Sequence, residues 1–222
     1  MVFKSPYSEV EVPDSLLGPF VLQHAERLAG EPALVDGGSG RALSYAEFTG
    51  ALKALAGGLR SRGFGKGDVL ALMAPNIPEY AVAFHGAAWA GGAVTTINPT
   101  YTAGEVCHQL KDSGARFLVT VTMFLSIAQE AAEGTGVEAI FTIDPSDAAN
   151  ITELMGEPLT EQVAVDNNDV VALPYSSGTT GLSKGVMLTH RNLIANLIQT
   201  AEMLPISEGE TVLAFLPFFH IY

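Results

Sequence analysis

The chain shows a repeating order of apolar and amphipathic segments that predicts strands and helices in alternation. Helical spacing of apolar residues, each time ended by a glycine, occurs over 44–63, 77–91 and 102–114. A further helix is expected over 124–133. Short apolar runs typical of buried strands occupy 69–75, 93–99, 116–121 and 138–143. This order predicts an α/β fold with layered, parallel-stranded sheets and crossover helices.

Two of the helices have a recognisable start. Ser44 with Glu47, and Thr102 with Glu105, stand three residues apart immediately before apolar helical patterns, as in a capping box. Glu79 lies at the expected start of the helix over 77–91, where a carboxylate interacts favourably with the helix dipole.

The alternation of apolar strand and helix patterns stops after residue 144. Residues 145–169 are polar and acidic, with one helical piece at 151–155, and we interpret them as a connector. It would join a first α/β unit at about 30–144 to a second unit starting at 170 and running to 222. The second unit is expected to hold a strand from 170, a helix over 190–203 and a strand over 211–216. Because the sequence stops just after an apolar strand pattern, we expect it to be part of a larger domain.

Composition narrows the possible partners. The 222 residues carry a net charge of −13, which argues against a nucleic-acid partner and favours a cytoplasmic enzyme. Cys107 is the single cysteine, so no internal disulfide is possible, and we expect it to be a packed or half-buried thiol. The N-terminus does not resemble a signal peptide, and the most apolar window, 80–94, is too short for a membrane span.

The stretch "LPYSSGTTGLSKGVMLTH", residues 173–190, is the main candidate for chemistry. Six consecutive residues, 176–181, are Ser, Gly or Thr, and Lys184 follows three places later. Such residues suit a polyphosphate, although composition alone equally allows a flexible surface loop. The Walker pattern fails because the lysine does not directly follow the second glycine, and the Rossmann glycine pattern fails as well. The glycines of 63–67 are interpreted as a tight turn that ends a helix.

The order of residues in "YSSGTTGLSKGVMLTH" resembles the signature of the adenylate-forming enzymes, with Ser183 where the family usually has proline. The segments "AWAGGAVTTINPTYTAGEVCHQLKDSGARFLVT", "VFKSPYSEVEVPDSLL" and "FLPFFHIY" resemble other parts of the same family, in particular 4-coumarate–CoA ligases. The resemblance covers the whole chain. It implies that the chain is an incomplete N-terminal adenylation domain, and we expect the small C-terminal domain of the family to lie outside these residues.

The resemblance implies roles for particular residues. Residues of the loop would hold the ATP phosphates, and Gly181 would allow the turn; the phosphate-binding residues are Ser176, Ser177, Gly178, Thr179, Thr180 and Lys184. His220 would lie beside the substrate carboxylate as a catalytic and substrate-binding residue, and Tyr222 would line the acyl pocket. Without the resemblance, His220 would be interpreted as a packed histidine at a strand end.

The implied reaction uses ATP, Mg²⁺ and coenzyme A together with a small carboxylic acid. The acid would be adenylated and then transferred to the CoA thiol, by the complete enzyme and not by these 222 residues alone. Since His220 stands where amino-acid-activating relatives have an aspartate, an amino acid is the least favoured substrate; hydroxycinnamate or another aryl acid ranks first and a fatty acid second. The alternatives are a fatty-acyl or luciferase-like relative, and a stand-alone nucleotide-binding module.

The remaining notable side chains are assigned structural roles. His24, His85 and His108 lie on helix-like segments without partners at metal-site or catalytic-triad spacing. His190 is a candidate cap for the helix that follows it, and Trp89 is expected in the core. The spacing of Cys and His predicts no metal site.

Overall fold

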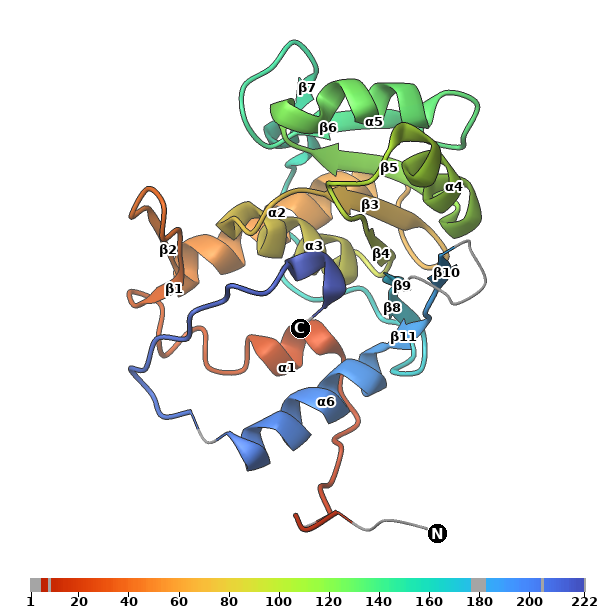
Figure 1. The fold of residues 1–222 in the computed structure, drawn as a ribbon. Helices are drawn as coiled ribbons and strands as arrows, with labels where there is room; N and C mark the ends of the chain where they lie inside the picture. Colours follow the sequence, from red (N-terminus) through yellow and green to blue (C-terminus); the bar gives the residue numbers. More distant parts are fainter. Residues whose placement is uncertain (1–4, 8, 177–182, 205, 222) are drawn as a thin grey trace, which may run out of the picture.

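A computed structural model describes residues 5–7, 9–176, 183–204 and 206–221. Its centre is a seven-stranded sheet in the order β11-β8-β4-β3-β5-β6-β7 (Figure 1). Neighbouring strands are parallel except for the antiparallel pair β11 and β8. The strands are β3 (Val69–Met73), β4 (Ala93–Thr96), β5 (Ala115–Thr120), β6 (Ala139–Thr142), β7 (Ala149–Asn150), β8 (Val170–Ala172) and β11 (Leu188–Thr189). The predicted α/β fold with a largely parallel sheet is confirmed.

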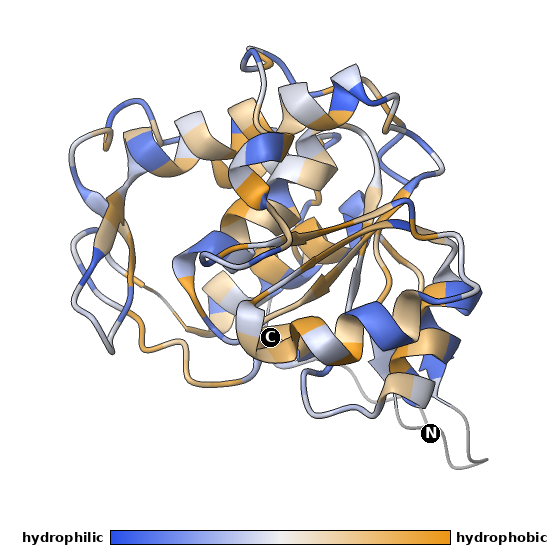
Figure 2. Ribbon diagram, turned by 90° about the horizontal axis from the view of Figure 1, so that it is seen from above, coloured by the Kyte–Doolittle hydropathy of each residue, from blue (hydrophilic) through white to orange (hydrophobic). Residues whose placement is uncertain are grey.

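Helices cover both faces of the sheet. Successive strand residues point to opposite sides, and in β3 the residues on both sides are apolar and need to be buried. Leu70 and Leu72 of β3 pack in a cluster with α2 (Tyr45–Ser61) and α3 (Pro78–Trp89). Ala71 and Met73 of the same strand pack in a second cluster, with α4 (Ala103–Ser113) and α5 (Leu125–Ala132), which follows the short 3₁₀ turn η1 (Thr122–Phe124). Hydrophobic colouring dominates the central strands in Figure 2, as expected for a sheet that is buried on both faces.

The two predicted capping boxes and the predicted glycine stop after α4 are confirmed. The Ser44 hydroxyl accepts a hydrogen bond from the Glu47 backbone N–H at 3.2 Å, and the Glu47 carboxylate accepts one from the Ser44 backbone N–H at 2.8 Å. Thr102 and Glu105 form the same reciprocal pair at the start of α4, which ends at Gly114 with a left-handed φ of 66°. These local signals act within one turn of chain, which explains why the sequence reveals them.

The segment between residues 145 and 169 packs against the first helices. It contributes β7 to the sheet and a 3₁₀ turn, η2 (Ile151–Leu154), at the predicted helical piece. Its backbone then donates hydrogen bonds from Gly156 to the Ala54 carbonyl at 2.9 Å and from Val163 to the Trp89 carbonyl at 2.9 Å. Trp89 is 5% exposed and belongs to the core, as expected.

Several elements near the chain's N-terminal end lie beside the sheet. A small antiparallel hairpin of β1 (Pro32–Val35) and β2 (Ala42–Ser44) precedes α2 and was not expected. The short helix α1 (Leu17–Val21) lies against α6 (His190–Met203) (Figure 1). The Leu17 backbone N–H donates to His190 Nδ1 at 3.2 Å.

The expectation that His190 caps α6 was wrong. Thr189 is the N-cap, because its side chain accepts a hydrogen bond from the Asn192 backbone N–H at 3.1 Å. His190 is instead the first helical residue and is buried, with 1% exposure. From the sequence, either Thr189 or His190 could be the residue that caps the helix. The structure shows that Thr189 is the cap and that His190 contacts α1.

The predicted strand over 211–216 is also wrong. These residues are irregular and exposed, with exposed fractions of 81% for Leu213 and 74% for Phe215. A strand requires a hydrogen-bonded neighbour, and no described residue provides one for this segment. Within the described part of the chain, no helix is both long and apolar enough to cross a membrane.

Candidate functional site

The Ser/Gly/Thr loop is carried by a two-stranded hairpin that follows the carboxyl end of β8. Its strands are β9 (Tyr175–Ser176) and β10 (Lys184–Gly185), which pair antiparallel with Ser176 opposite Lys184. Both side chains are exposed, and Lys184 forms no ion pair with any described residue. The other predicted phosphate-binding and turn residues fall outside the described residues: Ser177, Gly178, Thr179, Thr180 and Gly181.

The base of this hairpin is attached to helix α4. The hydroxyl of Tyr175 donates to Asp112 Oδ2 at 2.5 Å, and burial together with this carboxylate raises the pKa of Tyr175, so the phenol stays protonated. Gly185 lies across from Tyr175, and a Cβ at this position would stand 3.1 Å from the tyrosine ring. His108 Nε2 lies 3.4 Å from the carbonyl oxygen of Ser183. Tyr175 and Asp112 are supporting residues that the sequence analysis did not single out.

The segment that contains His220 crosses the carboxyl end of β3. Asn76, which follows β3, donates to the carbonyls of Ala214 and Leu216 at 3.1 Å and 2.8 Å and accepts from the Phe218 backbone N–H at 2.9 Å. The ring of Phe218 meets Tyr80 of α3 edge-on, with centroids 5.5 Å apart. One amide side chain therefore holds a stretch of backbone that has no strand partner among the described residues.

His220 lies at the end of a 3₁₀ turn, η3 (Phe218–His220), and not at a buried strand end. Its side chain is exposed and its ring lies against that of Phe219, with centroids 4.3 Å apart. The Phe219 carbonyl accepts a hydrogen bond of 2.7 Å from the Thr96 hydroxyl at the end of β4. Tyr222, the other predicted substrate-binding residue, lies outside the described residues.

The two predicted parts of the site meet at one edge of the sheet. The hairpin with Ser176 and Lys184 follows β8, and the His220 segment is attached to the ends of β4 and β3, which are the next strands in order. In open α/β sheets, ligands bind outside the carboxyl ends of the parallel strands. The arrangement therefore places the hairpin strands, with Lys184 unpaired among the described residues, near an aromatic, histidine-bearing segment.

Sequence reasoning missed three buried polar residues at this edge: Thr95 and Thr96 of β4, and Gln109 of α4. Their exposed fractions are 0%, 2% and 0%. The signal that could have revealed them is the hydroxyl pair that ends an otherwise apolar strand, "AVTT". Buried polar groups require partners, and the partners of this pair lie in the two segments described above.

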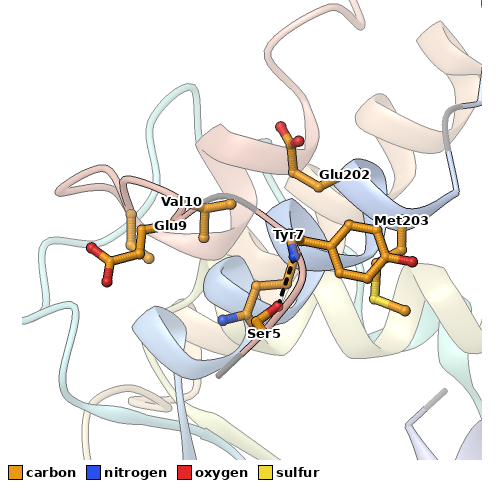
Figure 3. Close-up of a pocket in the computed structure, with 8 residues that line it drawn as sticks. Ser5, Tyr7, Glu9, Val10, Glu202 and Met203 are labelled. Atoms are coloured by element: carbon orange, nitrogen blue, oxygen red, sulfur yellow. Dashed lines mark hydrogen bonds between the residues drawn. The ribbon is translucent and has the colours of Figure 1, made fainter. Parts of the chain in front are cut away.

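A separate cavity of about 530 Å³ lies between the N-terminal segment and the C-terminal half of α6 (Figure 3). Tyr7, Glu9 and Met203 are among its lining residues, and the Tyr7 backbone N–H donates to Ser5 Oγ at 3.1 Å beside it. None of its lining residues belongs to the hairpin or to the His220 segment.

The other histidines and the cysteine have the surroundings of structural residues. His85 of α3 lies edge-on to Phe48 and Phe84, and loss of solvent lowers its pKa to about 4. His24 is exposed in a turn, which corrects its expected helical position. Cys107 is half-buried against the second core cluster, as expected. Among the residues that the structure covers, no group of three or more His, Cys, Asp or Glu side chains could hold a metal ion.

Comparison with curated proteins gives relatives that match the whole chain. It is 40% identical over 230 residues to 4-coumarate–CoA ligase 3 of Oryza sativa subsp. japonica and 37% identical over 233 residues to 4-coumarate-CoA ligase 1 of Narcissus pseudonarcissus. The match covers 41% and 42% of those two proteins. The chain therefore spans about two fifths of the length of the curated relatives it matches.

Comparison with solved structures agrees with this result. A long-chain-fatty-acid-CoA ligase from Archaeoglobus fulgidus superposes with a TM-score of 0.89 at 29% identity, over 98% of this chain and 45% of that one. O-succinylbenzoate coenzyme A synthetase from Bacillus subtilis, solved in complex with AMP, gives a TM-score of 0.75 at 29% identity, over 91% of this chain and 50% of that one. The family model described as "AMP-binding enzyme" matches residues 21–222. With this match over nearly the whole chain and the hairpin at the carboxyl edge of its sheet, the chain belongs to the family of AMP-binding, adenylate-forming enzymes.

Proposed function

We propose that the protein containing this chain activates a carboxylic acid with ATP and transfers the acyl group to coenzyme A. In the first step a carboxylate oxygen attacks the α-phosphorus, the bond to the pyrophosphate oxygen breaks, and acyl-AMP and pyrophosphate form. In the second step the CoA thiolate attacks the acyl carbon and AMP leaves. The observation that carries this proposal is the pairing of Ser176 with Lys184 at the mouth of a Ser/Gly/Thr loop, next to the His220 segment.

In this proposal Lys184 neutralises phosphate charge. It is an exposed cation, unpaired among the described residues, in a chain whose net charge is −13. The donors Ser176, Ser177, Thr179 and Thr180 and the backbone at Gly178 would complete the cradle, while Gly181 allows it to turn. Bringing a carboxylate to a triphosphate joins two anions, so positioning and charge neutralisation are the main tasks of these residues.

His220 and Tyr222 are proposed to face the acid. His220 would lie beside the carboxylate, and Tyr222 would form part of the acyl pocket. Mg²⁺ would accompany ATP and take its ligands largely from phosphate oxygens and water, as this ion commonly does in phosphoryl-transfer sites.

The proposed substrate is a hydroxycinnamate or another aryl acid. The 40% and 37% identities to plant 4-coumarate–CoA ligases support it, as does the aromatic segment of Phe218 and Phe219. A fatty acid is the second candidate, supported by the fatty-acid ligase that superposes at 29% identity. An amino acid ranks last, because its ammonium group would meet an imidazole in place of a carboxylate.

The test is an assay of the protein encoded by the complete open reading frame. Pyrophosphate release is measured with ATP, Mg²⁺, CoA and equal concentrations of a hydroxycinnamate, a medium-chain fatty acid and an amino acid. Release that depends on the acid supports the ligase, and ATP binding without release would support a nucleotide-binding module instead. Preference for the amino acid would contradict the substrate ranking. The 222 residues alone are expected to release no pyrophosphate above background.

Lys184→Ala in the same protein tests the phosphate role. Loss of one charge-assisted contact should lower kcat/KM for ATP about tenfold to a hundredfold. Lys111→Ala removes another exposed lysine, from the last turn of α4, and serves as the matched control. Equal kinetics for Lys184→Ala and the control would show that Lys184 does not contact the nucleotide.

A further inference from the structure

Three buried side chains at the carboxyl end of β4, those of Thr95, Thr96 and Gln109, form a chain of hydrogen bonds with one another and with backbone carbonyls. Gln109 Nε2 donates to Thr95 Oγ1 at 2.8 Å and to the Thr96 carbonyl at 3.0 Å. The Thr95 hydroxyl donates to the Leu173 carbonyl at 2.9 Å, and the Thr96 hydroxyl donates to the Phe219 carbonyl at 2.7 Å. These bonds link one helix, one strand and two separate loops.

The direction of every bond in this chain is fixed. A backbone carbonyl can only accept, so both threonine hydroxyls must donate their protons to the loops. The oxygen of Thr95 is then left to accept, and Gln109 must present its NH₂ group to it. The same amide orientation satisfies the Thr96 carbonyl. Each hydroxyl therefore donates its only proton to one loop carbonyl and cannot donate to another partner.

The two threonines reach opposite faces of the sheet because successive strand residues alternate. Thr95 shares the face of α4, and its acceptor, Leu173, is two residues before Tyr175 and the phosphate hairpin. Thr96 shares the face of α3, and its acceptor, Phe219, directly precedes His220. Adjacent residues of one central strand thus hold the entrance to the hairpin and the backbone beside His220.

We propose that Thr95, Thr96 and Gln109 are positioning residues that fix the distance between the nucleotide hairpin and the acid-binding segment. The proposal rests on the proposed function, and it assigns Thr95 to the nucleotide side, Thr96 to the acid side and Gln109 to both. The physical need is clear: the carboxylate must meet the α-phosphorus at bonding range, and small misplacements of reacting groups reduce rates steeply. β4 is buried on both faces, and close packing of this kind gives a rigid reference for that distance.

The test uses Thr95→Val, Thr96→Val and Gln109→Met, which keep approximate size and remove the donors. Thr95→Val should weaken ATP binding, measured by calorimetric titration, about fivefold to thirtyfold and leave KM for the acid within about twofold. Thr96→Val should raise KM for the acid by a similar factor and leave ATP binding within about twofold. Gln109→Met should weaken both. Thr95→Ser and Thr96→Ser retain the hydroxyl and should restore values close to wild type.

Thr120→Val is the matched control, since the Thr120 hydroxyl donates at 2.8 Å to the Met73 carbonyl, is equally buried and joins two strands of the same sheet. Variants that merely destabilise the fold lower the fraction of active enzyme, which reduces apparent kcat and leaves KM and ATP affinity unchanged. Equal effects of Thr95→Val and Thr96→Val on both ligands, or shifts in Thr120→Val as large as theirs, would overturn the proposal.

The two proposals fail in different ways. If the wild-type protein binds ATP but adenylates none of the acids, the ligase function fails, and the ATP titrations of Thr95→Val and Thr96→Val still decide the nucleotide half of the assignment. If the wild type is an active ligase and the threonine variants show no split between ATP and acid, the positioning role alone is refuted.

Discussion

Two apolar stretches of similar composition differ in structure and burial in this molecule. "VLALM", residues 69–73, forms the central strand β3, in which every residue is buried. "TVLAFL", residues 211–216, forms no strand, and its leucines and phenylalanine are exposed. The difference lies in their neighbours: β3 pairs with both β4 and β5, whereas the second stretch is held by the side chain of Asn76. Apolar composition therefore does not by itself decide burial.

The largest expected change in the free energy of unfolding comes from truncating a leucine in the buried stretch, and the same change in the exposed stretch is its control. Leu70→Ala should lower the free energy of unfolding by about 2–5 kcal/mol, because Leu70 is 0% exposed and its removal leaves a cavity. Leu213→Ala, at 81% exposure, should change it by less than about 0.5 kcal/mol. Urea unfolding followed by circular dichroism measures both. Comparable losses in the two variants would mean that residues 211–216 are packed in solution and would break the comparison.

A smaller effect is expected at the contact between α2 and η2. A Cβ at Gly58 would stand 1.6 Å from the Leu154 carbonyl oxygen, so Gly58→Ala must push the backbones apart and should destabilise the protein by about 1–3 kcal/mol. Gly50 lies in the same helix with no atom within 4 Å of its would-be Cβ. Gly50→Ala should therefore stabilise by about 0.5–1 kcal/mol through helix propensity. Thermal unfolding of the pair gives the result, and equal signs would contradict the close packing of the connector.

The packed region should also respond to pH. The folded pKa of His85 is about 4, below its unfolded value of about 6.5, because burial disfavours the imidazolium. The unfolded state binds more protons, so this contribution is fully present above about pH 6.5 and is lost as the pH falls toward 4. We expect stability to decrease by about 1–3 kcal/mol across this range. His85→Phe should flatten the dependence of stability on pH. A smaller pH dependence should remain because of His190, whose pKa is also lowered by burial. An unchanged curve in His85→Phe would show that His85 is solvated.

Little effect on global stability is expected at Asn76. Asn76→Ala removes three hydrogen bonds to residues 214–218 but leaves the sheet intact, so the free energy of unfolding should change by less than about 1 kcal/mol. Chymotrypsin should nevertheless cleave near Phe215 and Phe218 faster, as detected by mass spectrometry. Asn150→Ala, which removes the cap of η2, is the control. Equal cleavage in all three proteins would show that Asn76 does not hold the segment.

Much of the fold and part of the site could be predicted from local signals. The capping boxes at Ser44 and Thr102 act within one helical turn. The central strand β3 consists of apolar residues only, which favours its burial in the core. The motif around Ser176 and Lys184 was found because it is contiguous in the sequence. Its supporting residues were missed because Asp112, Gln109 and Thr95 are separated from it by about sixty residues or more, and no local pattern records such contacts.

The sequence by itself determined most of the alternation of strands and helices, the capping boxes at Ser44 and Thr102, and the presence of a small-residue stretch beside a lysine. These depend on periodicity, capping and backbone freedom, which are properties of neighbouring residues. Only the tertiary structure decided that Thr189 and not His190 caps α6, that residues 211–216 stay exposed, and that Thr95 and Thr96 bind two different loops. Each of these outcomes depends on which partner is within hydrogen-bonding or packing distance, and the folded chain alone brings those partners together.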